Sequence, residues 1–228
     1  MVDDLQVKVA TCCRMMEWLG LMDFNGHVSA RLPDTDYIYI NSYGKSRCTL
    51  TPEDIIRVDL QGRVVSEGTR APSEIPLHTS IYRMRPDVQA VAHIHSPMVI
   101  ILSIANKKII PVVGQGSIFP VSGVPVYDDS RLINSTERGE AMARTLGRER
   151  AVVLRAHGAT VVGESVEAAF FASFCLEDNA GKLFAAYQIG QPKALPSDEI
   201  EEGKSVFYTE RVYNKAWSYY HDKTGINF

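Results

Sequence analysis

Apolar side chains recur every three to four residues along several stretches of the chain, a spacing that predicts amphipathic helices. The first helix begins near Leu5 and ends at Gly20, since glycine is favoured just after a helix. Ser135 can cap another helix that runs to Gly147. The remaining helices are expected between Glu74 and Arg85, from about Pro97, over residues 166–188, and over residues 198–221 as one final helix.

Strands are expected where β-branched and aromatic residues cluster between turn residues. Such segments cover residues 37–41, 56–60, 63–65, 91–96, 109–113, 124–127 and 151–154, with a turn at Gln61-Gly62. Helices and strands intermix without strict alternation, and the chain has no glycine-rich nucleotide fingerprint. We therefore predict an α/β fold of three layers, α/β/α, with a central mixed sheet that is mainly antiparallel.

Length and composition favour one domain over residues 1–228. Of the 228 residues, 45% are hydrophobic and 22% are charged, which is enough for one large core. The net charge of -3 gives no electrostatic reason to expect nucleic acid as a partner. We therefore expect a small-molecule partner, and a local basic pocket could still bind an anionic substrate.

The cysteines and the amino terminus bear on location. The four cysteines show no C-x-x-C spacing, so neither a disulfide framework nor a zinc knuckle is predicted. The amino terminus is acidic where a signal peptide is basic, and no apolar run approaches the roughly 20 residues that span a bilayer. We expect a cytoplasmic protein without a membrane partner.

A pair of histidines carries the strongest chemical signal. His93 and His95 are two residues apart in an expected strand, so both imidazoles point to the same face. Enzymes usually hold a catalytic metal with three protein ligands, so further donors are needed. His157, at the end of an apolar strand, and Glu74, before a helix, are the best candidates. Imidazole and carboxylate together suit zinc, manganese or iron.

Two simpler interpretations stand beside this one. A lone His-X-His pair more often has a structural or surface role. Glu74 and His78 are four residues apart, so they could make an ordinary contact on one helix face. We assign His78 a supporting role behind the site.

Four motifs together carry a family resemblance. Gly26-His27-Val28-Ser29, Pro72-Ser73-Glu74, His93-Ile94-His95 and Ala156-His157-Gly158, in this order and at these separations, resemble the class II aldolase/adducin family over about residues 5–190. The resemblance implies a compact α/β/α domain, usually a homotetramer with sites between subunits. It also implies one divalent metal ion per subunit on His93, His95 and His157, with Glu74 as the acid/base group and a further ligand.

Departures from the aldolases change the expected substrate. The chain has His27 where fuculose phosphate aldolases have asparagine, Tyr43 before Gly44 where they have threonine, and Gln115 where they have a tyrosine that donates a proton. Loss of hydroxyl and amide donors should weaken phosphate binding. Lys45 and Arg47 add cationic groups that suit a carboxylate. The expected substrate-binding residues are Gly26, Ser29, Tyr43, Gly44, Lys45, Arg47, Ser73 and Gln115.

These changes make the chain resemble the metal-dependent decarboxylases of the family. The working hypothesis is decarboxylation of a hydroxylated, aromatic carboxylic acid, with Glu74 and His27 as the catalytic residues that handle protons. The aldolase branch implies Zn²⁺ and the decarboxylase branch Mn²⁺. The first alternative is an aldolase that cleaves a sugar phosphate or hydroxy-ketone, with a proton donor such as Tyr127. The second is an adducin-like interaction module without enzymatic activity.

Overall fold

A seven-stranded sheet forms the middle layer of the computed structural model, which describes residues 2–66 and 68–228. Its strand order is β3-β2-β1-β4-β7-β6-β5, and every neighbouring pair is antiparallel except the parallel pair β5 and β6. The strands are β1 (His27–Arg31), β2 (Tyr37–Asn41), β3 (Ile55–Asp59), β4 (Ala90–Ile94), β5 (Val126–Tyr127), β6 (Ala151–Leu154) and β7 (Gly158–Gly163). The prediction of a mixed, mainly antiparallel sheet is confirmed.

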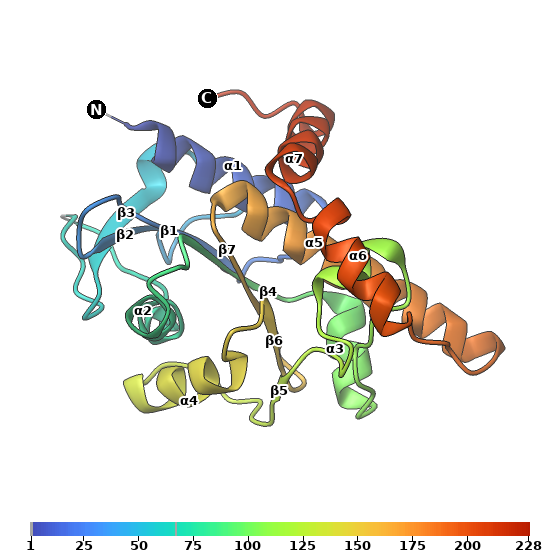
Figure 1. Ribbon diagram of the computed structural model, residues 1–228. Helices are drawn as coiled ribbons and strands as arrows, with labels where there is room; N and C mark the ends of the chain where they lie inside the picture. Colours follow the sequence, from blue (N-terminus) through green and yellow to red (C-terminus); the bar gives the residue numbers. More distant parts are fainter. Residues whose placement is uncertain (1, 67) are drawn as a thin grey trace.

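Helices cover both faces of this sheet (Figure 1). The helices are α1 (Asp4–Trp18), α2 (Ile75–Met84), α3 (Pro97–Ile104), α4 (Thr136–Leu146), α5 (Val166–Ile189), α6 (Ser197–Phe207) and α7 (Glu210–Thr224), with 3-10 turns η1 (Pro52–Asp54) and η2 (Gly114–Ile118). Helices α1, α5 and α7 pack together on one face, and α2 and α4 pack together on the other. The three predicted layers are therefore present. Within residues 2–66 and 68–228, no helix combines the length and apolar character that a membrane crossing requires.

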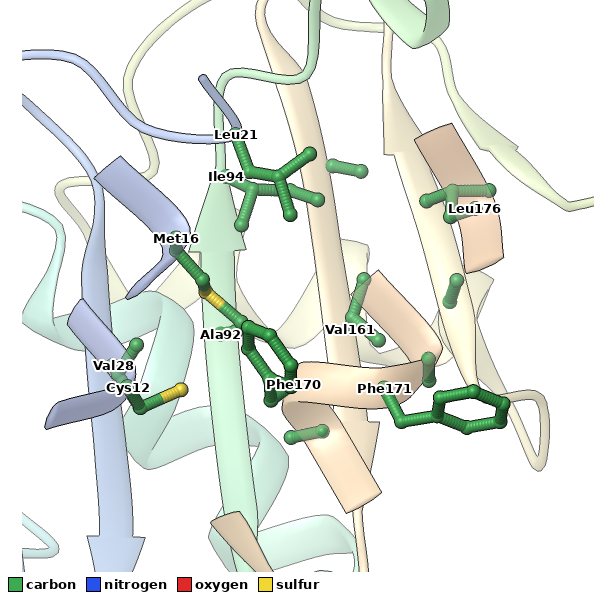
Figure 2. Packing of buried hydrophobic residues seen from close by; sticks show 14 of the residues in the cluster. Cys12, Met16, Leu21, Val28, Ala92, Ile94, Val161, Phe170, Phe171 and Leu176 are labelled. Atoms are coloured by element: carbon green, nitrogen blue, oxygen red, sulfur yellow. The ribbon is translucent and has the colours of Figure 1, made fainter. Parts of the chain in front are cut away.

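The larger core lies between the sheet and the layer of α1 and α5. Figure 2 shows Met16 of α1 and Phe170 of α5 beside Ala92 in the middle of β4. All three side chains are fully buried. The small alanine lets the large side chains of both helices approach the central strand, so β4 is held firmly at the centre of the fold.

The smaller core lies between the opposite face of the sheet and the helices α2 and α4. Leu77 and Ile81, one turn apart on α2, pack in this core with Ile38 and Ile40, which alternate along β2. Met142 of α4 joins the same core. Helix α2 is therefore fixed to the sheet by the side chains that follow Glu74 at helical spacing, as the sequence pattern predicts.

Two other local predictions are confirmed by their hydrogen bonds. The Ser135 side chain accepts a hydrogen bond from the Arg138 backbone and caps α4, as predicted. The turn at Gln61-Gly62 also forms, with Gly62 at φ 86°, and Asp59 N–H donates to the Arg63 carbonyl oxygen. The strand expected after this turn is reduced to a single bridge between Val58 and Val64.

The prediction of one final helix over residues 198–221 is wrong, because the chain breaks between α6 and α7. Tyr208 leaves the helical conformation at φ -115° and ψ 75°, and its ring lies 3.5 Å from the Arg150 guanidinium carbon. Helix α6 packs on η2, while Trp217 of α7 packs edge-to-face on Phe170 of α5. The two halves contact different neighbours, which a straight helix could not reach.

The segment 109–113 is also not a strand, contrary to the prediction. The Asn179 side chain accepts a hydrogen bond from Val112 N–H and donates one to the Ile110 carbonyl oxygen. A side chain of α5 therefore satisfies the backbone groups that a neighbouring strand would otherwise bond. The predicted strand over 124–127 shortens to the two residues of β5.

Candidate metal centre and pocket

The candidate site forms where three central strands come together. His27 is the first residue of β1 and pairs in register with His93, which lies near the end of the neighbouring strand β4. His157 immediately precedes β7, which pairs with β4 on its other side. The imidazoles of His93 and His157 meet with ring centroids 4.9 Å apart, as do those of His93 and His27. Strand pairing therefore brings together histidines that are far apart in sequence.

His95 lies just beyond the end of β4 rather than inside the strand. Its backbone N–H donates to the Leu21 carbonyl oxygen at 2.8 Å, which fixes the chain where it leaves the sheet. Its ring remains beside His93, with centroids 5.0 Å apart, and its Nδ1 lies 3.4 Å from an Asp23 carboxylate oxygen. The predicted pairing of the two imidazoles is thus present, although the strand ends one residue earlier than His95.

A tight turn presents His157. Ala156 adopts a left-handed conformation at φ 56°, and its N–H donates to Ser103 Oγ of α3 at 2.9 Å. Gly158 follows, and a Cβ at this position would lie 2.2 Å from the Ile94 carbonyl oxygen. Only glycine allows β7 to approach β4 this closely beside the candidate metal ligands. His157 Nδ1 is buried without a hydrogen-bond partner among residues 2–66 and 68–228.

Glu74 lies at the start of α2 and points its carboxylate at the histidines. One oxygen, Oε1, accepts a hydrogen bond from Ile133 N–H at 2.9 Å. The other, Oε2, lies 3.4 Å from His93 Nε2 and 3.8 Å from both His157 Nε2 and His27 Nε2. Burial alone would raise the pKa of Glu74, but its contacts with His27 and His93 hold that pKa well below its ordinary value. Glu74 is therefore ionised at neutral pH.

The tautomers of His93 and His95 test whether a cation fits. His93 Nδ1 lies 3.1 Å from the Ala159 carbonyl oxygen, and His95 Nδ1 faces Asp23, so both Nδ1 atoms act as donors. A neutral imidazole carries one proton, which leaves both Nε2 atoms with lone pairs. These two Nε2 atoms are 3.2 Å apart. Two lone pairs that face each other repel unless a cation lies against both, so the arrangement fits a bound metal ion.

The other protonation states agree with this fit. Burial lowers the pKa of His157 to about 4 and also lowers the pKa of His95, so both are neutral and able to coordinate at pH 7. Two groups of residues could each hold a metal ion, because the possible ligand atoms within each group lie within 4.8 Å of one another. The first group is His93, His95 and His157, and the second is His27, Glu74 and His93. His93 belongs to both sets. Neutral imidazoles with one carboxylate suit zinc or manganese.

A pocket of about 290 Å³ opens beside these side chains. It is lined by Asn25, Gly26, His27, Tyr43, Arg47, Pro72, Ser73, Glu74, His95, Leu132 and His157. Tyr43 is 56% exposed and Leu132 is 48% exposed, so an aromatic and an aliphatic side chain flank the opening. The pocket thus combines polar groups with apolar surface, as small-molecule sites do.

Arg47 is the buried cation of the pocket. Its side chain donates from Nε to the Gly26 carbonyl oxygen at 3.0 Å and from Nη1 to the Lys45 carbonyl oxygen. Burial lowers the pKa of Arg47, although arginine stays charged. Its Nη2 has no hydrogen-bond partner within the described parts of the chain, residues 2–66 and 68–228. A guanidinium held in this way can bind a carboxylate of a ligand.

Four of the predicted substrate-binding residues do not line this pocket in the single chain. Ser29 is fully buried, and its hydroxyl contacts His78 and Tyr82 instead. Lys45 points to solvent and forms a 2.9 Å ion pair with Asp54. Gly44 is exposed beside it, and Gln115 lies in η2, which packs on α6. The structure does bring together the predicted Gly26, Tyr43, Arg47 and Ser73.

Several residues of the site have no local sequence signal. Asp23 orients His95, and Ile133 holds Glu74 through a backbone N–H that lies 59 positions further along the chain. Leu132 and Asn25 line the pocket. An isolated aspartate or leucine in a loop belongs to no sequence pattern. The position of these residues at the site can therefore be recognised only from the structure.

Comparison with known proteins identifies the family. The family model described as "Class II Aldolase and Adducin N-terminal domain" matches residues 7–182. The chain belongs to this family, and the sequence prediction of membership is confirmed.

Named relatives and solved structures agree with the assignment. The chain is 33% identical over 207 residues to a 3,4-dihydroxyphthalate decarboxylase of Arthrobacter keyseri, covering 85% of this chain and 84% of that protein. It is 32% identical to the enzyme of the same name from Rhodococcus jostii, covering 83% of each. An L-fuculose 1-phosphate aldolase from Glaciozyma antarctica superposes with a TM-score of 0.85 at 22% identity, covering 96% of this chain and 88% of that one. This last likeness establishes the fold.

Proposed function

We propose that the protein is a metal-dependent carbon–carbon lyase that decarboxylates a hydroxylated aromatic carboxylic acid. The observation that carries the proposal is the facing pair of imidazole nitrogens, His93 Nε2 and His95 Nε2, 3.2 Å apart, with His95 lining a small pocket and His93 buried behind it. The same pocket holds an ionised carboxylate, Glu74, and a buried cation, Arg47. The relatives named 3,4-dihydroxyphthalate decarboxylase support this choice among the reactions of the family.

We propose that His93, His95 and His157 hold one divalent cation per chain, with Glu74 as a further ligand. Zn²⁺ is the first candidate and Mn²⁺ the alternative, since imidazole suits both. When bound, such a cation stabilises the electron density that remains on the substrate after carbon dioxide leaves.

Different residues of the pocket can bind different parts of the substrate. Arg47 can hold a carboxylate of the substrate through its free Nη2, because Nε and Nη1 are already bonded to the backbone. Tyr43 and Leu132 offer apolar surface to a ring. Lys45, which is paired with Asp54 at the surface, has no part in this assignment.

Glu74 is the group that moves the proton. It enters the reaction ionised, so Oε2 can accept the proton of the substrate hydroxyl and later return it to the ring carbon that has lost carbon dioxide. The hydrogen bond from Ile133 to Oε1 keeps Oε2 turned toward the pocket. His27 lines the same pocket and adds a polar contact for the substrate.

An aldolase acting on a sugar phosphate is the competing assignment. Tyr127, a proton donor considered for that reaction, lies in β5 at the edge of the sheet and is not among the residues that line the pocket. An adducin-like interaction module is a weaker candidate, because the full set of three histidines and a glutamate is retained around one point.

We further propose a homotetramer in the cytoplasm. Adjacent copies would complete the wall of the pocket, which is lined by the exposed side chain of Tyr43. The four cysteines are free, which fits a reducing compartment. Light scattering from the purified protein measures the assembly directly, with about four times the 25.3 kDa chain mass expected for a tetramer.

Product analysis tests the proposed reaction. The purified protein is incubated with 3,4-dihydroxyphthalate or with L-fuculose 1-phosphate, and carbon dioxide and aldehyde are measured in both mixtures. We expect carbon dioxide from the aromatic acid, no aldehyde from the sugar phosphate, and no product from a His95→Ala variant. Aldehyde release without carbon dioxide would assign the aldolase reaction instead.

A further inference from the structure

A chain of four buried side chains leads from the pocket wall into the core. His27 Nδ1 lies 2.7 Å from His78 Nε2, and His78 Nδ1 lies 2.7 Å from Ser29 Oγ. Ser29 Oγ in turn lies 2.9 Å from the Tyr82 hydroxyl. None of the four residues is more than 4% exposed. At the pocket end, His27 Nε2 faces Glu74 Oε2 at 3.8 Å.

The acceptor of the Tyr82 hydroxyl determines which atom donates in each of these hydrogen bonds. Ser29 Oγ is the single acceptor available to the Tyr82 hydroxyl within residues 2–66 and 68–228, so Tyr82 donates to Ser29. His78 Nδ1 is the one remaining partner of the Ser29 hydroxyl within the described residues, so the Ser29 hydrogen is donated to His78 Nδ1. A neutral imidazole carries one proton, so that of His78 lies on Nε2 and is donated to His27 Nδ1. Burial keeps His78 neutral by lowering its pKa well below the ordinary value.

The pocket end agrees with the same direction. His27 accepts at Nδ1, so its own proton lies on Nε2, which faces the Glu74 carboxylate oxygen Oε2 at 3.8 Å. The reverse direction leaves the Tyr82 hydrogen buried without an acceptor. It also turns a lone pair of His27 toward a carboxylate. Both ends of the chain therefore select one arrangement of protons.

We propose that His78, Ser29 and Tyr82 are positioning residues that hold His27 in its Nε2–H tautomer, so that His27 presents a hydrogen-bond donor to a substrate oxygen and is not a metal ligand. This assignment separates the two overlapping sets of possible ligands, because a protonated Nε2 cannot coordinate a cation. The metal then belongs to His93, His95 and His157. The substrate role of His27 rests on the proposed function, whereas its tautomer does not.

The tautomer can be measured directly in metal-free protein. Nitrogen-15 NMR of histidine side chains distinguishes Nε2–H from Nδ1–H, and the loss of one signal set in His27→Gln assigns His27. We expect Nε2–H for His27 in the wild-type protein and a mixture of tautomers in Ser29→Ala. Ser173→Ala, which removes another buried hydroxyl that bonds only within α5, should leave the His27 signals unchanged. Nδ1–H for His27 in the wild-type protein would overturn the inference.

Zinc titration provides a readout separate from turnover. His27→Gln should bind Zn²⁺ within about threefold of the wild-type affinity, whereas His95→Ala should lose at least roughly 100-fold. An equal loss in both variants would make His27 a ligand and contradict the inference. If the wild-type protein binds no zinc or manganese, the proposed function fails, and the NMR measurement still decides the tautomer.

Turnover separates positioning from a general structural effect. Ser29→Ala should lower kcat about tenfold with little change in KM, because the orientation of one donor is lost while the pocket wall remains. The Ser173→Ala control should retain both constants. A Ser29→Ala protein with wild-type kcat and an unchanged His27 tautomer would show that the chain does not position His27.

Discussion

Arg47 and Lys45 are two residues apart and carry the same charge, yet their surroundings give them different roles. Arg47 is 4% exposed and bonded to two backbone carbonyl oxygens, while the Lys45 side chain is 59% exposed and paired with Asp54. A surface ion pair of this kind contributes little. We therefore propose that a bound anion contacts the buried guanidinium of Arg47 and not the Lys45 ammonium group.

A matched pair of substitutions tests this difference. Arg47→Lys keeps the charge but loses the planar fork, so kcat/KM for an aromatic dicarboxylate should fall about 10-fold to 100-fold, mostly through KM. Lys45→Ala should change it by less than about threefold. Steady-state kinetics of both variants checks the prediction. A larger effect for Lys45→Ala than for Arg47→Lys would reverse the assignment.

Substitution of Glu74 tests the proton transfer proposed for its carboxylate. Glu74→Gln is nearly isosteric and keeps an oxygen for the hydrogen bond from Ile133, but it can no longer carry a proton. We expect kcat to fall by roughly 10²-fold to 10⁴-fold, the usual contribution of a positioned acid or base. Wild-type turnover of the Gln variant, measured as carbon dioxide release, would refute the proton role.

The chemistry of individual residues was partly predictable from sequence. His93, His95, His157 and Glu74 stand in short motifs whose joint order is specific, and the structure brings them together. Ser29 also stands in such a motif, but strand β1 turns its side chain toward His78 and away from the pocket. The direction of one side chain depends on which face of the sheet is buried, and the motif alone does not contain that information.

At the scale of elements, the turn between β6 and β7 determines where His157 lies. Ala156 in its left-handed conformation and Gly158 against the Ile94 carbonyl oxygen together set the path of the chain. The two positions respond differently to substitution, because one is limited by backbone conformation and the other by space.

Substitutions at Ala156 and Gly158 test whether backbone conformation limits the first position and space limits the second. Gly158→Ala places a methyl group 2.2 Å from a backbone oxygen, so the free energy of unfolding should fall by about 1–3 kcal/mol. Metal affinity should fall with it, since His157 moves. Ala156→Gly relieves the left-handed conformation and should change the free energy of unfolding by less than about 1 kcal/mol. Urea denaturation of both variants gives the comparison, and equal stability losses would contradict it.

The element boundaries that sequence reasoning missed share a physical cause. The apolar spacing continues through Tyr208, so the pattern predicts one final helix, but α6 and α7 pack on different partners. The segment 109–113 looks like a strand, but its backbone bonds to Asn179 of α5. In both cases a contact with a distant part of the chain decides the local conformation, whereas helices with their own cap, such as α4 after Ser135, followed the prediction.

At the scale of the whole molecule, the site joins elements from most of the fold. Its residues come from β1, the end of β4, the start of α2 and the turn before β7, and a metal ion on His93, His95, His157 and Glu74 would tie the last three of these together. A ligand that binds only the folded state stabilises it by mass action. Metal binding should therefore be visible as a change in global stability.

Thermal denaturation with and without metal measures this coupling. With Zn²⁺ or Mn²⁺ at about 100 times its dissociation constant, the stabilisation is about 2.7 kcal/mol, which should raise Tm by roughly 5–10 °C for a chain of this size. His95→Ala should show no shift at the same metal concentration. An equal shift in the variant would locate the stabilising metal elsewhere on the molecule.

The most direct test of the central claim is carbon dioxide release from 3,4-dihydroxyphthalate by protein stripped with a chelator and then supplied with metal. We predict that the stripped protein releases none and that about one equivalent of Zn²⁺ or Mn²⁺ per chain restores turnover. Full carbon dioxide release by the stripped protein would contradict a metal-dependent reaction at His93, His95 and His157.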